Sequence, residues 1–153
     1  MKATMLLKRD HQTVSSLFRD FERLRDDDHK ARRELFLRIK NELDIHTRIE
    51  EEIFYPELFK VSEIEDLIRE ARTEHDLVKD LCNEIARLQP DDPDYIAKVA
   101  VLRENVEHHV EEEEGEMFPL AKKHLSGERL EKIAQQLEDR KEELARKLKV
   151  ELV

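Results

Sequence analysis

The sequence predicts an all-α protein: a four-helix up-down bundle built from two pseudo-symmetric helical hairpins, plus a fifth helix at the C-terminal end. Three observations support this fold. The 153 residues include only two glycines and four prolines, which leaves few sharp turns. Charged residues make up 43% and hydrophobic residues 39%, a composition typical of long amphipathic helices. Apolar side chains recur every three or four residues along almost the whole chain, which is the helical period.

The first hairpin is predicted from periodicity and charge. Its first helix runs from about residue 4 to residue 25 and ends at the acidic segment Asp26-Asp27-Asp28. The second helix follows, from about residue 30 to residue 60. Its positive N-terminal end is favoured by the three aspartates that precede it.

The remaining helices carry clearer start signals. Ser62, with Glu65 three residues on, has the pattern of a capping box and opens a third helix that ends near residue 88. Asp92 is the expected N-cap of the fourth helix, with Pro93 in its first turn, and this helix continues to about residue 124. A fifth helix follows from about residue 126, and its apolar stripe consists of Leu130, Ile133, Leu137, Leu144 and Leu148.

The two hairpins repeat each other in sequence. His75 follows His11 by 64 positions, and the apolar residues after each histidine match. His109 follows His46 by 63 positions, and each opens a His-x-x-x-Glu-Glu segment with a proline ten residues after the histidine. The shift of one residue falls between helices, where loop length is free to vary. We therefore expect two related helical hairpins.

Six of the repeated residues are of metal-ligand type and lie on apolar faces of their helices. Residues four apart on a helix share a face, so each histidine of the His-x-x-x-Glu segments projects together with its glutamate. The other two histidines share their faces with valine, leucine and isoleucine side chains. The six predicted metal ligands are His11, His46, Glu50, His75, His109 and Glu113.

Metal ions explain why these residues would be buried together. Burying two unpaired carboxylates costs several kcal/mol each, and burial also opposes protonation of the imidazoles. Imidazole and carboxylate are common ligands of transition metals. Two carboxylates from opposite helices can each bridge two ions. The predicted cofactor is thus a pair of non-haem iron ions with a bridging oxo or hydroxo group from solvent, although zinc or manganese suits the same ligands.

Neighbouring residues offer alternatives. His108 and Glu112 have the same spacing as the histidine–glutamate pair one residue further on and are the alternative ligands on this helix. Glu51 and Glu114 directly follow the predicted glutamate ligands. They either accept hydrogen bonds that orient the imidazoles or face solvent.

Three further residues are weighed in the same way. Tyr55 falls on the far side of an ideal helical wheel from the histidine of its helix, unless Pro56 bends the helix there; a tyrosine near iron could bind it or take part in catalysis. Glu116 faces nearly inward and marks either an iron entry route or a solvated end of the bundle. Cys82 aligns with Phe18 in the repeat and is expected to be a buried apolar residue.

At these residues the sequence resembles the hemerythrin-like family, also called the HHE cation-binding domain. The resemblance covers about residues 5 to 125. The matching signatures are Asp10-His11, His46-Thr-Arg-Ile-Glu50-Glu51, Glu74-His75-Asp76, His109-Val-Glu-Glu-Glu113-Glu114, Tyr55-Pro56 and Phe118-Pro119.

The resemblance implies a di-iron centre that reacts with O₂, peroxide or nitric oxide. It implies a single hemerythrin-like domain over residues 1–153, with the metal-binding bundle in residues 1–125 and the fifth helix in residues 126–153. The implied ligand sets are His11 and His46 on one iron, His75 and His109 on the other, and Glu50 and Glu113 as bridges.

One departure from the family pattern affects the expected function. Oxygen-carrying hemerythrins have a fifth histidine one turn after the third-helix ligand, where this sequence has Lys79. A lysine is a poor iron ligand, so we expect a more open second iron. We therefore expect a reaction with a small oxidant, either H₂O₂ in a catalase-like cycle or O₂ or NO. The alternatives are a non-catalytic sensor or store for O₂, NO or iron, and a metal-free structural bundle.

Charge and composition limit the partners. The net charge of −10 disfavours non-specific binding to nucleic acid, which needs a basic surface. No apolar run approaches 20 residues, so no membrane span is expected, and no signal peptide is visible. A single cysteine fits a reducing compartment, which makes the cytoplasm the expected location. The sequence leaves the oligomeric state open.

Overall fold

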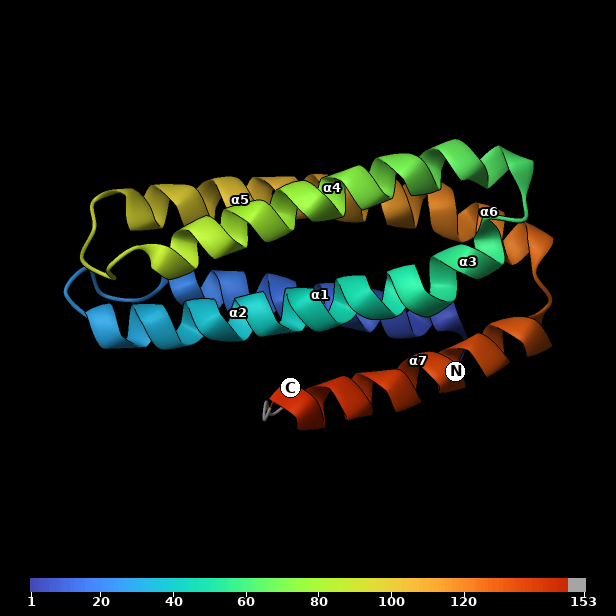
Figure 1. The fold of residues 1–153 in the computed structure, drawn as a ribbon, viewed down its shortest axis with the longest axis horizontal. Coiled ribbons are helices and arrows are strands. Elements are labelled where there is room, and N and C mark those ends of the chain that lie inside the picture. Colours follow the sequence, from blue (N-terminus) through green and yellow to red (C-terminus); the bar gives the residue numbers. More distant parts are fainter. Residues whose placement is uncertain (149–153) are drawn as a thin grey trace.

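The computed structural model describes residues 1–148 and consists of helices that run up and down a single bundle (Figure 1). α1 (Ala3–Glu22) and α2 (His29–Ile49) form the first hairpin. α4 (Ser62–Arg87) and α5 (Asp94–Glu112) form the second, which lies beside the first. The predicted all-α architecture of two helical hairpins is confirmed over the described residues.

The second helix of each hairpin is interrupted at the same place. α2 passes through a π-helical turn, η1 (Glu50–Phe54), into the short helix α3 (Tyr55–Leu58). In the same way α5 passes through η2 (Glu113–Met117) into α6 (Phe118–His124). Both π-turns begin at a glutamate of a His-x-x-x-Glu segment, so the interruption lies at the predicted metal ligands.

Proline explains both π-turns. Each short helix has proline in its first turn, and proline lacks an N–H and clashes with the carbonyl four residues back. A wider turn relieves this conflict: Tyr55 N–H bonds to Glu50 O, and Phe118 N–H bonds to Glu113 O, both five residues back. The extra residue changes the direction of later side chains by about 100° relative to an uninterrupted α-helix.

The helix starts agree only partly with the sequence. Asp28 is the N-cap of α2 and accepts a hydrogen bond from Ala31 N–H at 3.2 Å, as its acidic segment suggests. Asp92 accepts from Asp94 N–H at 2.8 Å, although Pro93 stands directly before the first residue of α5. α1 ends at Glu22, three residues before the predicted end of the first helix.

The predicted capping box at Ser62 is wrong. Ser62 is already the first residue of α4, and Val61 before it is extended and makes no side-chain cap. The reason is the tight turn out of α3, in which Val61 N–H bonds to Leu58 O at 2.9 Å and Ile64 N–H to Val61 O at 3.0 Å. This turn starts the helix one residue before a serine cap would.

α7 (Gly127–Leu148) lies along the first hairpin, where it packs on α1, α2 and η1 (Figure 1). Its apolar stripe is therefore covered by its own bundle. Leu148 is an exception to the predicted stripe: it is 46% exposed and lines a surface cleft. Residues 149–153 of the predicted fifth helix lie outside the described residues. The buried residues of α7 are Leu130, Ile133, Ala134, Leu137, Leu144 and Ala145.

The apolar core consists of two clusters, and the predicted ligands lie between them. Along α1, Leu7 belongs to one cluster and Val14 to the other, with His11 between. α2 and α4 also change cluster near their histidines, and around His109 the change lies between Val106 of α5 and Met117 of η2. The polar residues therefore form a layer across the middle of a dry core.

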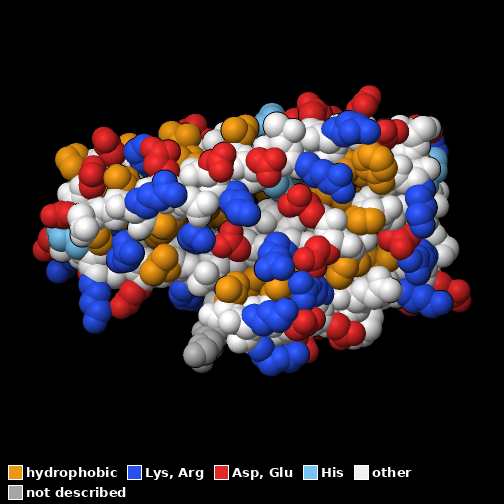
Figure 2. Space-filling model, in the orientation of Figure 1, with side chains coloured by type: hydrophobic (Ala, Val, Ile, Leu, Met, Phe, Trp, Pro, Cys, Tyr) orange, Lys and Arg blue, Asp and Glu red, His pale blue; other side chains and the backbone are white. Residues whose placement is uncertain are grey.

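The surface is highly charged. Acidic and basic side chains are interspersed over the face shown in Figure 2, and hydrophobic groups appear there only in small patches. Among residues 1–148, no helix has the length and apolar character needed to cross a membrane.

Docking of α7 should contribute to the stability of the whole bundle. Leu137 is fully buried, so Leu137→Ala should lower the free energy of unfolding by about 2–5 kcal/mol through lost packing. Leu148→Ala removes a half-exposed leucine of the same helix and should change the free energy of unfolding by no more than about 0.5 kcal/mol. Denaturant unfolding measures both. Equal effects of the two substitutions would contradict the packing described for α7.

Candidate metal centre

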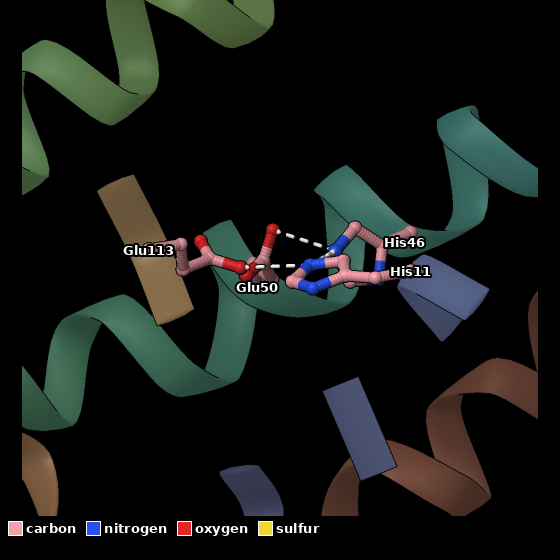
Figure 3. A group of neighbouring side chains, drawn as sticks. All are labelled: His11, His46, Glu50 and Glu113. Carbon is pink, nitrogen blue, oxygen red and sulfur yellow. Dashed lines mark hydrogen bonds and ion pairs between the residues drawn. The ribbon is translucent and has the colours of Figure 1, made fainter. Parts of the chain in front are cut away.

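The structure brings the six predicted ligand residues together in the middle of the bundle. They form two groups of four, and both groups contain Glu50 and Glu113. Figure 3 shows the first group, in which side chains from α1, α2, η1 and η2 converge. None of the six is more than 7% exposed. The groups are His11, His46, Glu50 and Glu113, and Glu50, His75, His109 and Glu113.

In the first group, the inner ring nitrogens and the carboxylates are within ligand spacing of one another. His11 Nε2 lies 3.2 Å from His46 Nε2 and 3.0 Å from Glu113 Oε1. His46 Nε2 lies 3.1 Å from Glu50 Oε1 (Figure 3). Atoms bound at roughly 2.0–2.2 Å to a common ion have this spacing.

The second group has the same geometry around the other hairpin. His75 Nε2 lies 3.2 Å from His109 Nε2 and 3.4 Å from Glu50 Oε1. His109 Nε2 lies 3.4 Å from Glu113 Oε2. Because the two carboxylates face both groups, they are placed to bridge two neighbouring ions.

A carboxylate partner fixes the direction of every histidine in the centre. In each case the outer nitrogen, Nδ1, meets a carboxylate oxygen, so Nδ1 carries the proton and the lone pair of Nε2 points inward. Such partners are typical of metal-bound histidines. The pairs are His46 with Asp10 at 3.0 Å, His109 with Glu74 at 2.9 Å, His75 with Glu51 at 3.1 Å and His11 with Glu114 at 2.6 Å.

These partners follow the sequence repeat. Glu51 and Glu114 thus orient imidazoles, one of the two roles that the sequence leaves open for them. Asp10 and Glu74 are the residues that the sequence analysis missed, since they were noted only as parts of the family signatures. A signal for them exists: both directly precede the first histidine of a hairpin, 64 positions apart.

The arrangement leaves buried oxygen atoms without a proton donor. Within the described part of the chain, both oxygens of Glu50 and Oε1 of Glu113 have no hydrogen-bond partner. The nitrogens that face them carry lone pairs, since the protons are held at Nδ1. Buried, unpaired carboxylates are strongly unfavourable. The centre therefore requires positive charge, and two metal ions among these donors would provide it.

The raised pKa values of His46 and His109 point to the same requirement. Burial opposes the charged form of His109, but hydrogen bonds to Glu113 and Glu74 outweigh it and raise its pKa to about 10. The pKa of His46 is also raised well above its usual value, because Glu50 and Asp10 outweigh burial. Without a metal, the carboxylates would draw protons onto these rings instead.

Comparison with known proteins shows the family of this chain. The family model of the hemerythrin HHE cation binding domain matches residues 3–121. The chain belongs to this family. A crystal structure of a hemerythrin HHE cation-binding domain-containing protein from Mycobacterium kansasii has a TM-score of 0.83 to this hemerythrin-like chain, with 28% sequence identity, 94% of this chain covered and 87% of that one.

Relatives in other organisms differ in length. An uncharacterised protein of Mycobacterium bovis is 31% identical over 94% of this hemerythrin-like chain and 88% of its own length. A DNA nickase of a Nostoc species is 27% identical over 94% of this chain, but this chain spans only 40% of it. An uncharacterised hemerythrin-like protein of Schizosaccharomyces pombe is 32% identical over 57% of this chain and 44% of its own length.

Tyr55 also lies in the centre of this hemerythrin-like bundle. The ideal helical wheel, which puts its side chain on the far side of the helix from the histidine, is therefore wrong at this residue. The π-turn η1 rotates it inward, where it is fully buried. Its hydroxyl donates to Glu113 Oε2 at 2.6 Å and lies 3.4 Å from His75 Nε2. Burial and the Glu113 carboxylate raise the pKa of Tyr55 well above its usual value, so the phenol keeps its proton.

The other candidates lie outside the centre. The side chain of His108 is 66% exposed and contacts Glu112 at 2.9 Å, so this pair does not replace its inward neighbours. Glu116 is exposed, in agreement with a solvated bundle end. Cys82 is buried, and burial raises its pKa to about 12, as expected for a thiol that acts as an apolar residue.

Metal binding by this hemerythrin-like chain should release protons. At pH 7 a histidine with a pKa near 10 is protonated in metal-free protein, and Nε2 must lose that proton to bind a metal. Affinity should therefore rise as the pH is raised from 6 towards the pKa of His109. Calorimetric titration in two buffers of different protonation enthalpy counts the released protons. A heat that does not depend on the buffer would contradict this expectation.

Proposed function

We infer that this chain is a non-haem di-iron protein that reacts with a small oxidant: H₂O₂ in a catalase-like cycle, or O₂ or NO. The proposed cofactor is two iron ions with a bridging oxo or hydroxo group. The observation that carries the proposal is that two ligand groups share two carboxylates beside a very small apolar cavity. The proposed ligands are His11 and His46 on one iron, His75 and His109 on the other, and Glu50 and Glu113 on both.

The donor set supports iron but does not select it by affinity. Imidazole and carboxylate also suit zinc and manganese, and affinity orders alone do not distinguish these metals in a cell. Each ion would have two nitrogen and two oxygen donors from the protein. This number leaves coordination positions for solvent and for an incoming molecule, which favours reactivity over a closed structural site.

The size of the cavity limits the substrate. Its volume is about 20 Å³, enough for roughly one water-sized molecule. The four histidines of the centre form one wall, and apolar side chains with one threonine form the rest. A molecule of two to four atoms fits such a cavity, whereas an organic substrate does not. The other lining residues are Val14, Leu43, Thr47, Val78, Val106 and Val110.

The position of Lys79 supports an open site. Lys79 is exposed and lines a surface cleft, whereas Val78 beside it lines the inner cavity. No lysine, arginine or fifth histidine lines that cavity within residues 1–148. The cavity is therefore free for a small ligand, which favours turnover or sensing over the oxygen storage of five-histidine relatives.

Tyr55 is the proposed proton-holding residue of the reaction. Its phenol keeps its proton beside Glu113 and lies at the second ligand group, close to His75. It can donate a proton to Glu113 Oε2 or to a molecule bound nearby, and recover it afterwards. Breakdown of peroxide, 2 H₂O₂ → O₂ + 2 H₂O, requires proton transfer of this kind. Two iron ions would give two electrons to the H₂O₂ that is reduced to water and take two electrons from the H₂O₂ that is oxidised to O₂.

The alternative function is a non-catalytic sensor or store for O₂, NO or iron. A cavity for a single small molecule, enclosed by apolar side chains, would also hold a stable adduct. Under either function, we propose a single domain in which residues 1–125 bind the metals and the following helix supports the first hairpin. The single buried cysteine fits a cytoplasmic setting.

The first test combines metal content with peroxide turnover. Purified protein should contain two irons per chain and release O₂ from H₂O₂. His46→Ala removes a proposed ligand and should abolish O₂ release and lower the iron content. His124→Ala removes a histidine at the surface end of α6, paired with Glu63, and should change neither.

The outcomes separate the candidate functions. Two irons with O₂ release support the enzyme. Two irons with a persistent new absorption band but no gas support the sensor or store and contradict the catalase-like cycle. Purified protein that holds no iron, or a single zinc ion, contradicts the di-iron proposal.

The role of Tyr55 is tested by Tyr55→Phe. Loss of the phenolic proton should leave two irons per chain but lower peroxide turnover by roughly a hundredfold, the usual size of a lost proton-transfer step. Tyr95→Phe is the matched control, because Tyr95 is a buried tyrosine that packs on Phe21 and Phe36 away from the centre. Unchanged turnover in Tyr55→Phe would exclude the proton-transfer role.

A further inference from the structure

The carboxylate that orients His46 also contacts a lysine side chain on its outer side. Asp10 accepts from His46 Nδ1 with Oδ2 and from Lys141 of α7 with Oδ1. In the first hairpin, therefore, Lys141 of α7 supplies a positive charge next to the carboxylate that orients His46.

The equivalent carboxylate of the second hairpin has no such lysine. Glu74 occupies the repeat position of that aspartate and accepts from His109 Nδ1 with Oε1. Its other oxygen, Oε2, lies 4.0 Å from Nε2 of the exposed His108. Within residues 1–148 no lysine or arginine forms an ion pair with Glu74, and α7 lies along the other hairpin (Figure 1).

The residues around this carboxylate also differ between the hairpins. In the first hairpin, the positions beside the ligands are Ile45 and Ile49, both fully buried in the cluster that α7 covers. The residues 63 positions later are His108 and Glu112, which remain accessible at the surface. Metal-ligand side chains thus replace apolar ones at the place where the second hairpin lacks its covering helix.

The geometry of these side chains fits a metal ion. His108 Nε2 lies 2.9 Å from Glu112 Oε1, and one donor atom from each of these residues and Glu74 can be chosen so that all three lie within 4.8 Å of one another. Three donors around an ion at roughly 2.0–2.2 Å need only a small closing of this triangle. The partial exposure of all three side chains leaves room for water as the remaining ligands.

We propose that Glu74, His108 and Glu112 form an outer site for an exchangeable divalent transition-metal ion. The ion takes the place that Lys141 holds in the first hairpin and compensates the outer oxygen of Glu74. One imidazole and two carboxylates suit Zn²⁺, Fe²⁺ or Mn²⁺. Few protein ligands and open access to solvent make the ion exchangeable rather than structural.

The outer ion acts on the inner centre through Glu74. This carboxylate holds the Nδ1 proton of His109, and partners of this kind set the orientation and basicity of a metal-bound imidazole. A cation on the other oxygen makes Glu74 a weaker acceptor, so His109 becomes a weaker donor to its metal. This second step rests on the proposed di-iron function, whereas the outer site itself does not.

The test uses iron-loaded full-length protein and Zn²⁺ as the probe. Equilibrium dialysis followed by elemental analysis measures bound zinc and retained iron together. Wild type should bind one zinc per chain with no loss of iron. His108→Ala and Glu112→Gln should each weaken this binding by roughly tenfold or more, since each removes a ligand. His124→Ala, which disrupts another surface histidine–glutamate pair, should bind zinc like wild type.

Each outcome tests either the outer metal site or its effect on the inner centre. The outer site is overturned if wild type binds no zinc beyond what displaces iron, or if His108→Ala and Glu112→Gln bind as wild type does. The effect on the inner centre is read from the visible iron spectrum, which should shift on zinc addition in wild type but not in His108→Ala. Bound zinc without a spectral shift overturns the coupling through Glu74 alone. Failure of the di-iron function would be visible separately, as the absence of iron before any zinc is added.

Discussion

The need to neutralise two buried carboxylates is the constraint on which the rest of the structure depends. Glu50 and Glu113 lie buried in the middle of the apolar core. Within residues 1–148, both oxygens of Glu50 and Oε1 of Glu113 meet no proton donor. Four imidazoles surround them, but each points a lone pair inward because its outer nitrogen meets another carboxylate. Such a centre is stable only with added positive charge, from protons or from metal ions. The family to which the chain belongs is one of cation-binding domains, in agreement with this charge balance.

Duplication builds the centre, and the fifth helix makes its two halves unequal. The hairpins place equivalent pairs of histidines around the same two carboxylates, Glu50 and Glu113. α7 packs along the first of them, where Lys141 and a cover of apolar side chains protect the outer side of the centre. The other hairpin keeps its outer carboxylate near solvent, with ligand-type residues beside it. The two ligand groups therefore share Glu50 and Glu113 but have different outer surroundings.

The reactivity proposed for the centre depends on exclusion as much as on ligands. A cavity of about 20 Å³, lined by the four histidines, valine and leucine side chains and one threonine, would give access to the ligand groups only to a very small molecule. Tyr55, the buried phenol beside Glu113, keeps its proton in this environment because burial and the carboxylate oppose its ionisation.

The sequence by itself determined the features that depend on local periodicity. Four-residue spacing within a helix puts His46 with Glu50 on one face, and the repeat predicts that four helices send such residues to one layer. Tertiary structure decided what depends on backbone hydrogen bonding and on packing between helices. The π-turns relieve the clash at proline and turn Tyr55 into the centre, which an ideal helical wheel places outside. Asp10 and Glu74 orient histidines on neighbouring helices, and α7 packs along the first hairpin. Such contacts join residues far apart in the chain, so no local pattern specifies them.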